Sequence, residues 1–187
     1  MEIGKKNRIV EFVRTYWLYL IVGFMVFAMA MTFTLLATLG NTTPVSTSPI
    51  EFFLPMTDAN IVQDYSDTEL QINETLNQWE AHLSVDLASE TSDVCAILDG
   101  VVTNVDYNVL DGHFITITHS NGLVATYSSL AEKINVKVGD KVKGGDKIGD
   151  ASDSATSELD LGAHLCLTMK LNDKYVDPNL YLDLQSK

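Results

Sequence analysis

Two pairs of side chains in this sequence have spacings that suit metal binding or proton transfer. In GAHLCLTM, His164 and Cys166 are two residues apart, so on a strand they project from the same face. In AHLSVDLAS, His82 and Asp86 are four residues apart. Imidazole, thiolate and carboxylate are all zinc ligands, and a zinc site needs three or four such groups to converge. Each pair alone is equally typical of packed or surface side chains, so a metal site depends on elements that bring the pairs together.

Those elements are predicted to be short strands. In the second half of the chain, apolar and polar residues alternate in runs broken by turn residues, and no long helix is indicated. Asn121 and Gly122 lie between two β-branched runs, which predicts a hairpin, and a second hairpin is predicted to turn at Asn172 and Asp173. The pattern predicts a mainly β domain, an antiparallel sandwich or barrel. Residues 66–79 give only weak helical or irregular signals.

The amino-terminal part is predicted to be a membrane anchor. No charged residue occurs from 15 to 50, and residues 17–39 are almost wholly apolar. At ~1.5 Å per residue, such a run is long enough to cross the hydrocarbon layer. Lysines and arginines precede it, so the head should stay in the cytoplasm and the rest should be exported. A cleaved signal peptide is the alternative, but its small-residue site AMA at 28–30 falls in the middle of the run.

The predicted organisation therefore has five parts. They are a basic cytoplasmic head at 1–15, a transmembrane helix at 16–40, a linker at 41–50, a pre-domain segment at 51–80 and a β domain at 81–187. The linker is assigned because NTTPVSTSP is rich in Ser, Thr and Pro and has no hydrophobic period.

The predicted exported part is strongly acidic. After residue 50, eight lysines and no arginine stand against twenty-three Asp and Glu residues, a formal charge of −15. Such a surface repels phosphate backbones, which argues against a nucleic-acid partner, and it also disfavours anionic cell-wall polymers. Cys95 and Cys166 are the only cysteines, and an exported domain could pair them, although the sequence does not show that they come close.

Six segments, in this order, resemble the landmarks of the lysostaphin-type, or LytM, zinc metallopeptidase family. They are AHLSVDLAS, DGVV, FITITHSNGLVATYSSL, VKVGDKVKGGDKIG, GAHLC and YVDPNLYL. Together they span residues 82–182, most of the predicted exported part. The resemblance implies a LytM-type antiparallel β fold with a groove that holds one zinc ion. It also implies an activity that cuts peptide bonds of peptidoglycan.

The resemblance further implies roles for individual residues. Zinc would be held by His82 and Asp86, with Cys166 in the place of the family's third ligand, a histidine. His164 matches a histidine that binds no metal but helps to position the attacking water and to stabilise the transition state. Ser129 stands where the family has a second histidine of this kind.

Several positions depart from the family pattern. A thiolate at Cys166 would make zinc a poorer Lewis acid. The hydroxyl of Ser129 cannot shuttle a proton near neutral pH, and such losses cost on the order of 10²–10⁴ in rate. Ser84 replaces the usual glycine between the first two ligands. The loop before GAHLC carries four acidic residues in place of glycines: Asp150, Asp153, Glu158 and Asp160. These carboxylates would repel those of a peptidoglycan stem peptide.

The favoured function is therefore a catalytically impaired scaffold in the bacterial envelope that binds another exported protein. The layout of one span, a linker and a pre-domain segment is similar to that of sporulation members of the family, which implies a ring-forming partner between forespore and mother cell. A zinc-dependent peptidoglycan endopeptidase is the alternative. In a third hypothesis, zinc held by His82, Asp86 and Cys166 only stiffens the groove.

Overall fold

The structure is a computed structural model that describes the chain apart from its two ends and one internal stretch. Described are residues 3–39 and 50–184, with side chains for 11–19, 21–32 and 50–184. Contacts divide the chain into two units, 1–49 and 50–187, which are considered separately. All but the last residue of the predicted linker at 41–50 lies outside the described residues.

The first unit contains the helix α1 (Ile3–Leu39). Within its described part, no single helix is both long and apolar enough to cross a membrane. The segments Glu11–Tyr19 and Ile21–Thr32, bent by 46° at their junction, meet the requirement together by length and composition. A membrane crossing by this unit therefore stays a prediction.

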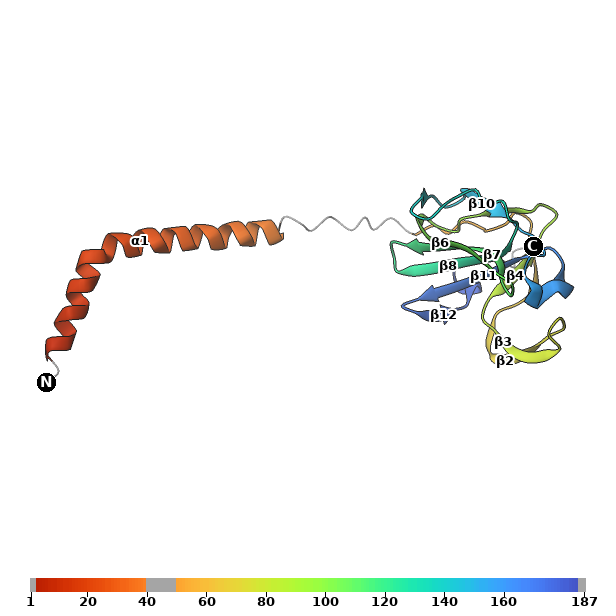
Figure 1. The fold of residues 1–187 in the computed structure, drawn as a ribbon, viewed down its shortest axis with the longest axis horizontal. Coiled ribbons are helices and arrows are strands. Elements are labelled where there is room, and N and C mark those ends of the chain that lie inside the picture. Colours follow the sequence, from red (N-terminus) through yellow and green to blue (C-terminus); the bar gives the residue numbers. More distant parts are fainter. Residues whose placement is uncertain (1–2, 40–49, 185–187) are drawn as a thin grey trace. The chain divides into compact units, whose positions relative to one another are not determined.

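The second unit is built on one antiparallel sheet with the strand order β1-β4-β11-β8-β7-β6-β9, and β12 pairs with β11 (Figure 1). Its strands are β1 (Asn60–Gln63), β4 (Val85–Ala88), β6 (Gly100–Asn108), β7 (Gly112–His119), β8 (Leu123–Leu130), β9 (Lys141–Val142), β11 (Leu165–Leu171) and β12 (Lys174–Val176). All of these pairings are antiparallel, which confirms the predicted mainly β antiparallel domain.

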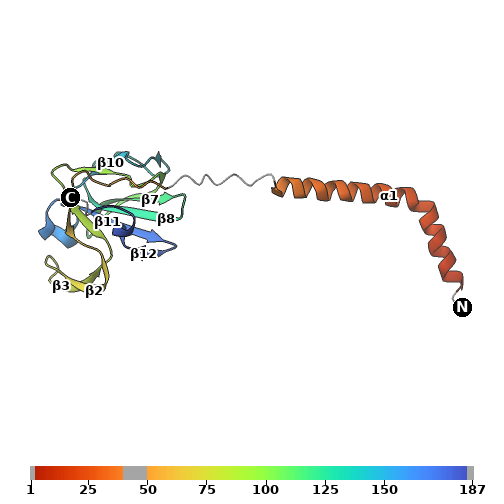
Figure 2. The ribbon, with the colours of Figure 1, turned by 180° about the vertical axis from the view of Figure 1, so that it is seen from behind.

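Smaller elements complete this unit. They are the two-stranded sheets β2 (Ser66–Asn73) with β3 (Gln78–His82) and β5 (Asp93–Cys95) with β10 (Lys147–Asp150), and the 3₁₀ helices η1 (Thr156–Leu161) and η2 (Pro178–Leu180). The β2–β3 hairpin lies to one side of the main sheet in both views (Figures 1 and 2). The stretch with weak helical signals in the sequence thus forms a hairpin.

Both hairpins predicted from turn residues are present. β11 and β12 are joined by Asn172 and Asp173, which adopt φ values of 52° and 62°. β7 and β8 are joined through Gly122, which has a φ of 83° and whose N–H donates to the carbonyl of His119 at 3.1 Å. Positive φ is costly for most residues but not for Gly, and it is tolerated by Asn and Asp, so the local chemistry specifies both turns.

The hydrophobic core is drawn from residues 52–184, so the second unit carries a core of its own. Along β8, β11 and β4, alternate side chains such as Tyr127, Leu167 and Leu87 are fully buried in this core. Fully burying each such apolar side chain contributes about 1.5–3 kcal/mol. The phenol of Tyr127 also accepts a hydrogen bond from the backbone N–H of Ile97 at 2.9 Å. This packing fixes three adjacent strands, and their opposite face carries the candidate site.

Candidate metal centre

The floor of the candidate site is the face of β4, β11 and β8 that points away from the core. Asp86 on β4 is the register partner of Cys166 on β11, and Cys166 is in turn the partner of Ser128 on β8. Because strand neighbours alternate between faces, these three residues lie side by side opposite the apolar residues of the same strands. The register of three strands, not the sequence spacing, therefore places Asp86 beside Cys166.

His82 ends β3 and meets Asp86 across the turn into β4. Its Nδ1 lies 2.9 Å from the carbonyl oxygen of Asp64, to which it donates, so Nε2 is the atom that faces the floor. Nε2 lies 3.1 Å from Oδ2 of Asp86 and also 3.1 Å from the hydroxyl of Ser84. The two residues paired in the sequence by their spacing thus converge through a nitrogen and a carboxylate oxygen.

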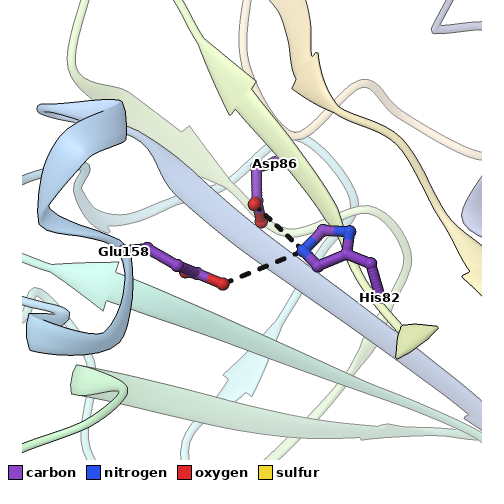
Figure 3. A group of neighbouring side chains, drawn as sticks. All are labelled: His82, Asp86 and Glu158. Carbon is purple, nitrogen blue, oxygen red and sulfur yellow. Dashed lines mark ion pairs between the residues drawn. The ribbon is translucent and has the colours of Figure 1, made fainter. Parts of the chain in front are cut away.

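Glu158 brings a third group to this cluster (Figure 3). It lies in η1, where its own φ and ψ of −136° and 32° depart from helical values. Its side chain points at the imidazole of His82, with Oε1 3.8 Å from Nε2. Atoms of His82, Asp86 and Glu158 that could bind a metal all lie within 4.8 Å of one another.

The position of η1 is fixed by contacts with two distant turns. The backbone N–H and hydroxyl of Thr156 both donate to the carbonyl of Val109, at 3.2 Å and 2.6 Å. The backbone N–H of Asp160 donates to the hydroxyl of Thr75, in the β2–β3 turn, at 3.1 Å. Glu158 lies between these anchors, so its approach to the cluster follows from the packing of η1.

His164, which precedes β11, lies on the other side of Glu158. Its Nδ1 donates to the carbonyl of Gly162 at 2.8 Å, and its Nε2 lies 3.2 Å from Oε2 of Glu158. The imidazole is fully buried. Glu158 therefore places one carboxylate oxygen near each of the two imidazoles, His82 and His164.

Ser129 is held in a different arrangement. It adopts a φ of 59°, and its side chain is fully buried. Its hydroxyl donates to the carbonyl of Ser152 at 2.7 Å, while the hydroxyl of Ser152 donates to the carbonyl of Ser129 at 3.1 Å. The hydroxyl of Ser129 is thus used in a clamp between two backbone segments.

Cys166 lies against Ser84 and Asp86, but its sulfur is not in the group of donor atoms within 4.8 Å of one another. Cys166 and Cys95 are both free thiols in the structure. Burial raises the pKa of the Cys166 thiol well above its usual range, and the nearby charges of Asp86 and Glu158 raise it further. With only these neighbours around it and no metal ion bound, Cys166 is a neutral thiol at neutral pH.

The remaining groups of the cluster form a charged network. Burial lowers the pKa of His82, but the nearby carboxylates of Asp86 and Glu158 and the contact with the Asp64 carbonyl together outweigh burial and raise the pKa to about 10. Burial raises the pKa of Glu158, but the hydrogen bond with His164 and the nearby imidazole of His82 together outweigh burial and lower the pKa to about 2. Burial lowers the pKa of His164, but its hydrogen bonds to Glu158 and the Gly162 carbonyl, together with the charges of Asp86 and Glu158, outweigh burial and raise it. By themselves, these contacts favour imidazolium and carboxylate forms.

Asp86 gives the clearest sign of a metal site. It is fully buried, and neither of its carboxylate oxygens receives a well-directed hydrogen bond from the described residues, although Oδ2 is at ion-pair distance from His82. A buried carboxylate without such bonds carries a large desolvation cost unless a cation compensates it. Protonated His82 is the compensating cation in the network itself, and a bound metal ion would take over that role. The donor set of imidazole and carboxylate groups fits a divalent ion such as zinc.

Two hollows of the described domain have neither His82, Asp86 nor Glu158 in their lining. One is lined by residues of the β1–β4 region: Thr57, Asp58, Asn60, Ala88, Ser89, Glu90 and Thr91. Another lies between the start of the domain and its end, and includes Leu54, Met56 and Leu184. Of the acidic residues in the loop before β11, Asp150 pairs with Lys147 at 2.7 Å and so does not join the cluster.

The structure thus brings together His82 and Asp86, places Cys166 beside Asp86, and directs Ser129 into a backbone clamp. The sequence alone predicted Glu158 only as one repulsive charge in an acidic loop. The one signal in the sequence is its position six residues before His164, and that spacing does not predict which loop carboxylate turns inward. The kink at Glu158 and the anchors of η1 decide this.

Comparisons with known proteins agree with the fold. A family model described as Peptidase family M23 matches residues 80–178. An uncharacterized metalloprotease of Buchnera aphidicola is 36% identical over 98 residues, which are 52% of this chain and 25% of that protein. The peptidoglycan DD-endopeptidase ShyC of Vibrio cholerae is 34% identical over 80 residues, 42% of this chain and 18% of that protein. The matched part is therefore about a quarter or less of the length of each relative.

Among solved structures, the chain is similar to one in the structure of the SpoIIQ-SpoIIIAH pore forming complex. The TM-score is 0.63 and the sequences are 25% identical, and the match covers 73% of this chain and 94% of the other. This likeness extends beyond the residues matched by the family model to most of the second unit.

Proposed function

The chain belongs to peptidase family M23, and on that premise we propose that it is a membrane-anchored scaffold whose M23 domain binds an exported partner protein and is impaired as a peptidase. The proposed setting is the bacterial envelope in sporulation, between forespore and mother cell. A stage III sporulation protein AH-like protein is the proposed partner. The likeness to the SpoIIQ-SpoIIIAH structure supports this choice.

The observation that carries the proposed loss of activity is the clamp made by Ser129. At the position where the resemblance places a catalytic imidazole, the structure has a buried hydroxyl that donates to the Ser152 carbonyl. A hydroxyl with a pKa far from neutral cannot exchange a proton with substrate at neutral pH, and it carries no positive charge for an oxyanion. Losses of this kind cost on the order of 10²–10⁴ in rate.

Both ring nitrogens of the second imidazole, that of His164, already have partners within the domain. His164 donates Nδ1–H to a backbone carbonyl, and its Nε2 lies beside Oε2 of Glu158. The atom that would face a substrate is therefore paired with a carboxylate of the same domain. Freeing it requires Glu158 to move away, which costs the network its hydrogen bonds.

The residues fit a zinc ion, because Asp86 is buried without well-directed hydrogen bonds and His82 directs Nε2 toward it. In an active peptidase such an ion polarises the scissile carbonyl and activates water. In this chain, His82, Asp86 and either Cys166 or Glu158 would hold it. Proton transfer, however, would have to rely on His164 alone.

The anchoring part of the proposal rests on composition. Residues 15–50 carry no charge, and basic residues precede them. We expect the amino terminus in the cytoplasm and the domain outside it. In fractionated cells the full chain should be found with membranes, and protease added from outside should digest residues 50–187. A full chain that remains soluble would contradict the anchor.

The test of impaired catalysis uses purified residues 50–187, which carry their own core, and purified peptidoglycan with added Zn²⁺. We expect muropeptide release at least ~10²-fold below that of an active M23 enzyme assayed in parallel. The matched control is His82→Ala, because any true activity must vanish with it. Robust release by the unmodified domain that is lost in His82→Ala would overturn the scaffold proposal.

The partner is tested separately with purified components. Residues 50–187 and the exported domain of the stage III sporulation protein AH homologue from the same organism are mixed and analysed by light scattering after gel filtration. A defined complex at micromolar concentration is expected. If the two proteins elute independently, the partner assignment fails, whatever the hydrolysis assay shows.

A zinc-dependent peptidoglycan endopeptidase remains the second candidate. The geometry that favours it is the 3.1 Å approach of His82 to Asp86, which matches two ligands implied by the family resemblance. The hydrolysis assay above distinguishes the two functions.

A further inference from the structure

Glu158 is the residue of the cluster for which the family resemblance implies no role. We propose that this domain binds a divalent metal ion through His82, Asp86 and Glu158, so that a carboxylate from η1 serves as the third ligand in the place of the side chain at position 166. This goes beyond the proposed scaffold function, since it holds whether or not the partner assignment is correct.

His82, Asp86 and Glu158 offer donor atoms that all lie within 4.8 Å of one another. Figure 3 shows the carboxylates of Asp86 and Glu158, from two separate segments, both directed at the imidazole of His82. Donor atoms at this separation can close on one ion with small side-chain adjustments, because metal–ligand distances for these atoms are about 2 Å.

The burial of Asp86 supports a cation site independently of that distance. Asp86 has no exposed surface, and both of its oxygens lack well-directed hydrogen bonds within the described domain. Such a group points to a cation site more strongly than an exposed acidic cluster does. His82 contributes the matching feature, because its bond to the Asp64 carbonyl leaves Nε2 as the donor atom.

The carboxylate of Glu158 is held in place by a second imidazole. Its second oxygen lies 3.2 Å from Nε2 of His164, which is itself oriented by the Gly162 carbonyl. This chain of contacts resembles the outer-shell support that orients metal-binding carboxylates in other proteins. His164 would then act as a positioning residue for Glu158.

The rival ligand is Cys166. It lies beside Asp86 on the neighbouring strand, yet its sulfur is outside the group of converging donor atoms. A site with Glu158 would have one nitrogen and two carboxylates around the ion, whereas a site with Cys166 would include sulfur. The two donor sets have different spectra and different preferences among metals, which makes them separable by experiment.

The choice of ligand also affects chemistry. Two carboxylates balance both charges of a divalent ion, whereas a set of two imidazoles and one carboxylate leaves one positive charge. An ion that is neutralised in this way polarises a carbonyl or water less. A metal held by Glu158 is therefore compatible with a domain that binds metal and catalyses poorly.

The experiment uses residues 50–187, stripped of metal with a chelator and then dialysed against Zn²⁺. About one equivalent of zinc per chain is expected. Glu158→Gln should weaken zinc binding by roughly tenfold or more, since it keeps the shape of the side chain and removes its charge. The matched control is Asp160→Asn, which changes an exposed carboxylate of the same segment and should leave binding unchanged.

Cobalt provides a second readout. The Co²⁺-loaded domain should show d–d bands without a sulfur-to-cobalt charge-transfer band, and Cys166→Ser should leave the spectrum and affinity unchanged. Glu158→Ala, with folding checked by circular dichroism, repeats the test if Glu158→Gln unfolds. A charge-transfer band that Cys166→Ser removes would overturn the proposal, and so would a domain that binds neither ion.

Discussion

The candidate site has two sides that differ in how closely they follow the family pattern. The donor side consists of His82 and Asp86 on β3 and β4, and it has the residues and the convergence that the resemblance implies. The loop side consists of Ser129, Glu158 and Cys166, from β8, η1 and β11. On the loop side, a hydroxyl is clamped to backbone, and a carboxylate occupies the space next to both imidazoles.

Under the proposed function, this contrast separates the chemistry that the domain would keep from the chemistry that it would lack. The donor side needs only correct positions of a nitrogen and a carboxylate, and the carboxylate is placed by the register of β4 with β11. The loop side is where a peptidase would transfer protons. Metal binding thus depends on His82, Asp86 and the proposed ligand Glu158, whereas proton transfer depends on position 129 and His164.

The largest expected effect comes from rebuilding the loop side. In the triple variant Ser129→His, Cys166→His and Glu158→Ala, an imidazole returns at each altered position and the competing carboxylate is removed. Peptidoglycan hydrolysis should rise by on the order of 10²–10³ over the unmodified domain, measured as muropeptide release. Ser129→His alone should gain much less, because Glu158 still holds His164. No gain in the triple variant would mean that the loop side is not the cause of impaired catalysis.

The next effect is on the donor side. Asp86→Asn should reduce zinc affinity by on the order of 10²-fold, because it removes a charged ligand. The metal-free domain should unfold at the same or a higher temperature, since a buried carboxylate without well-directed hydrogen bonds is replaced by a neutral group. Isothermal titration and thermal unfolding measure the two quantities. A large loss of metal-free stability would show instead that the ion pair with His82 is essential to the fold.

The two sides also differ in how far they could be predicted from sequence. His82 and Asp86 could be identified because they stand four residues apart and match the ligand pair that the family resemblance implies, and the β11–β12 hairpin because Asn172 and Asp173 suit positive φ. The role of Glu158 depends on two hydrogen bonds that hold η1 in place. Thr156 bonds to Val109, 47 residues away along the chain, and Asp160 bonds to Thr75, 85 residues away. No local pattern carries that information.

The β2–β3 hairpin was also beyond local prediction. Its side chains are mostly exposed, including large ones such as Trp79 and Leu70, so hydrophobic alternation gives little signal. Its contribution to the site is indirect. It ends at His82 and carries Thr75, which holds η1, so it supports both sides at once.

A smaller effect is expected at Ser84, which lies on the donor side. Its hydroxyl is 3.1 Å from Nε2 of His82 and competes with a metal ion for that atom. Ser84→Ala should therefore raise zinc affinity by up to ~10-fold, since a net hydrogen bond contributes about 0.5–1.5 kcal/mol. The control on the loop side is Ser129→Ala, which should leave zinc affinity unchanged. If Ser84→Ala weakens binding, the hydroxyl supports the imidazole and does not compete with the ion.

Ser129→Ala should in turn lower the free energy of unfolding by about 0.5–1.5 kcal/mol, because it removes one hydrogen bond. The loss is expected to stay at this level because the carbonyl of Ser152 also accepts from the backbone N–H of His164 at 3.1 Å. Chemical denaturation measures the change. A loss of several kcal/mol would show that the clamp is a central support of the fold.

The smallest effect concerns a histidine outside both sides. Burial lowers the pKa of His119, although its hydrogen bond to the Asp99 carbonyl opposes the shift, and its Nε2 has no partner among the described residues. A lowered pKa in the folded state means that protonation favours unfolding. The contribution of His119 to stability is therefore present above the ordinary histidine pKa of 6.5 and is lost as the pH falls through the lowered pKa of the folded state. Chemical denaturation at about pH 7 and about pH 5, on either side of the usual histidine range, measures the free energy of unfolding at both conditions. His119→Gln should reduce the fall in this free energy between about pH 7 and about pH 5. If the fall is unchanged in His119→Gln, other groups cause it.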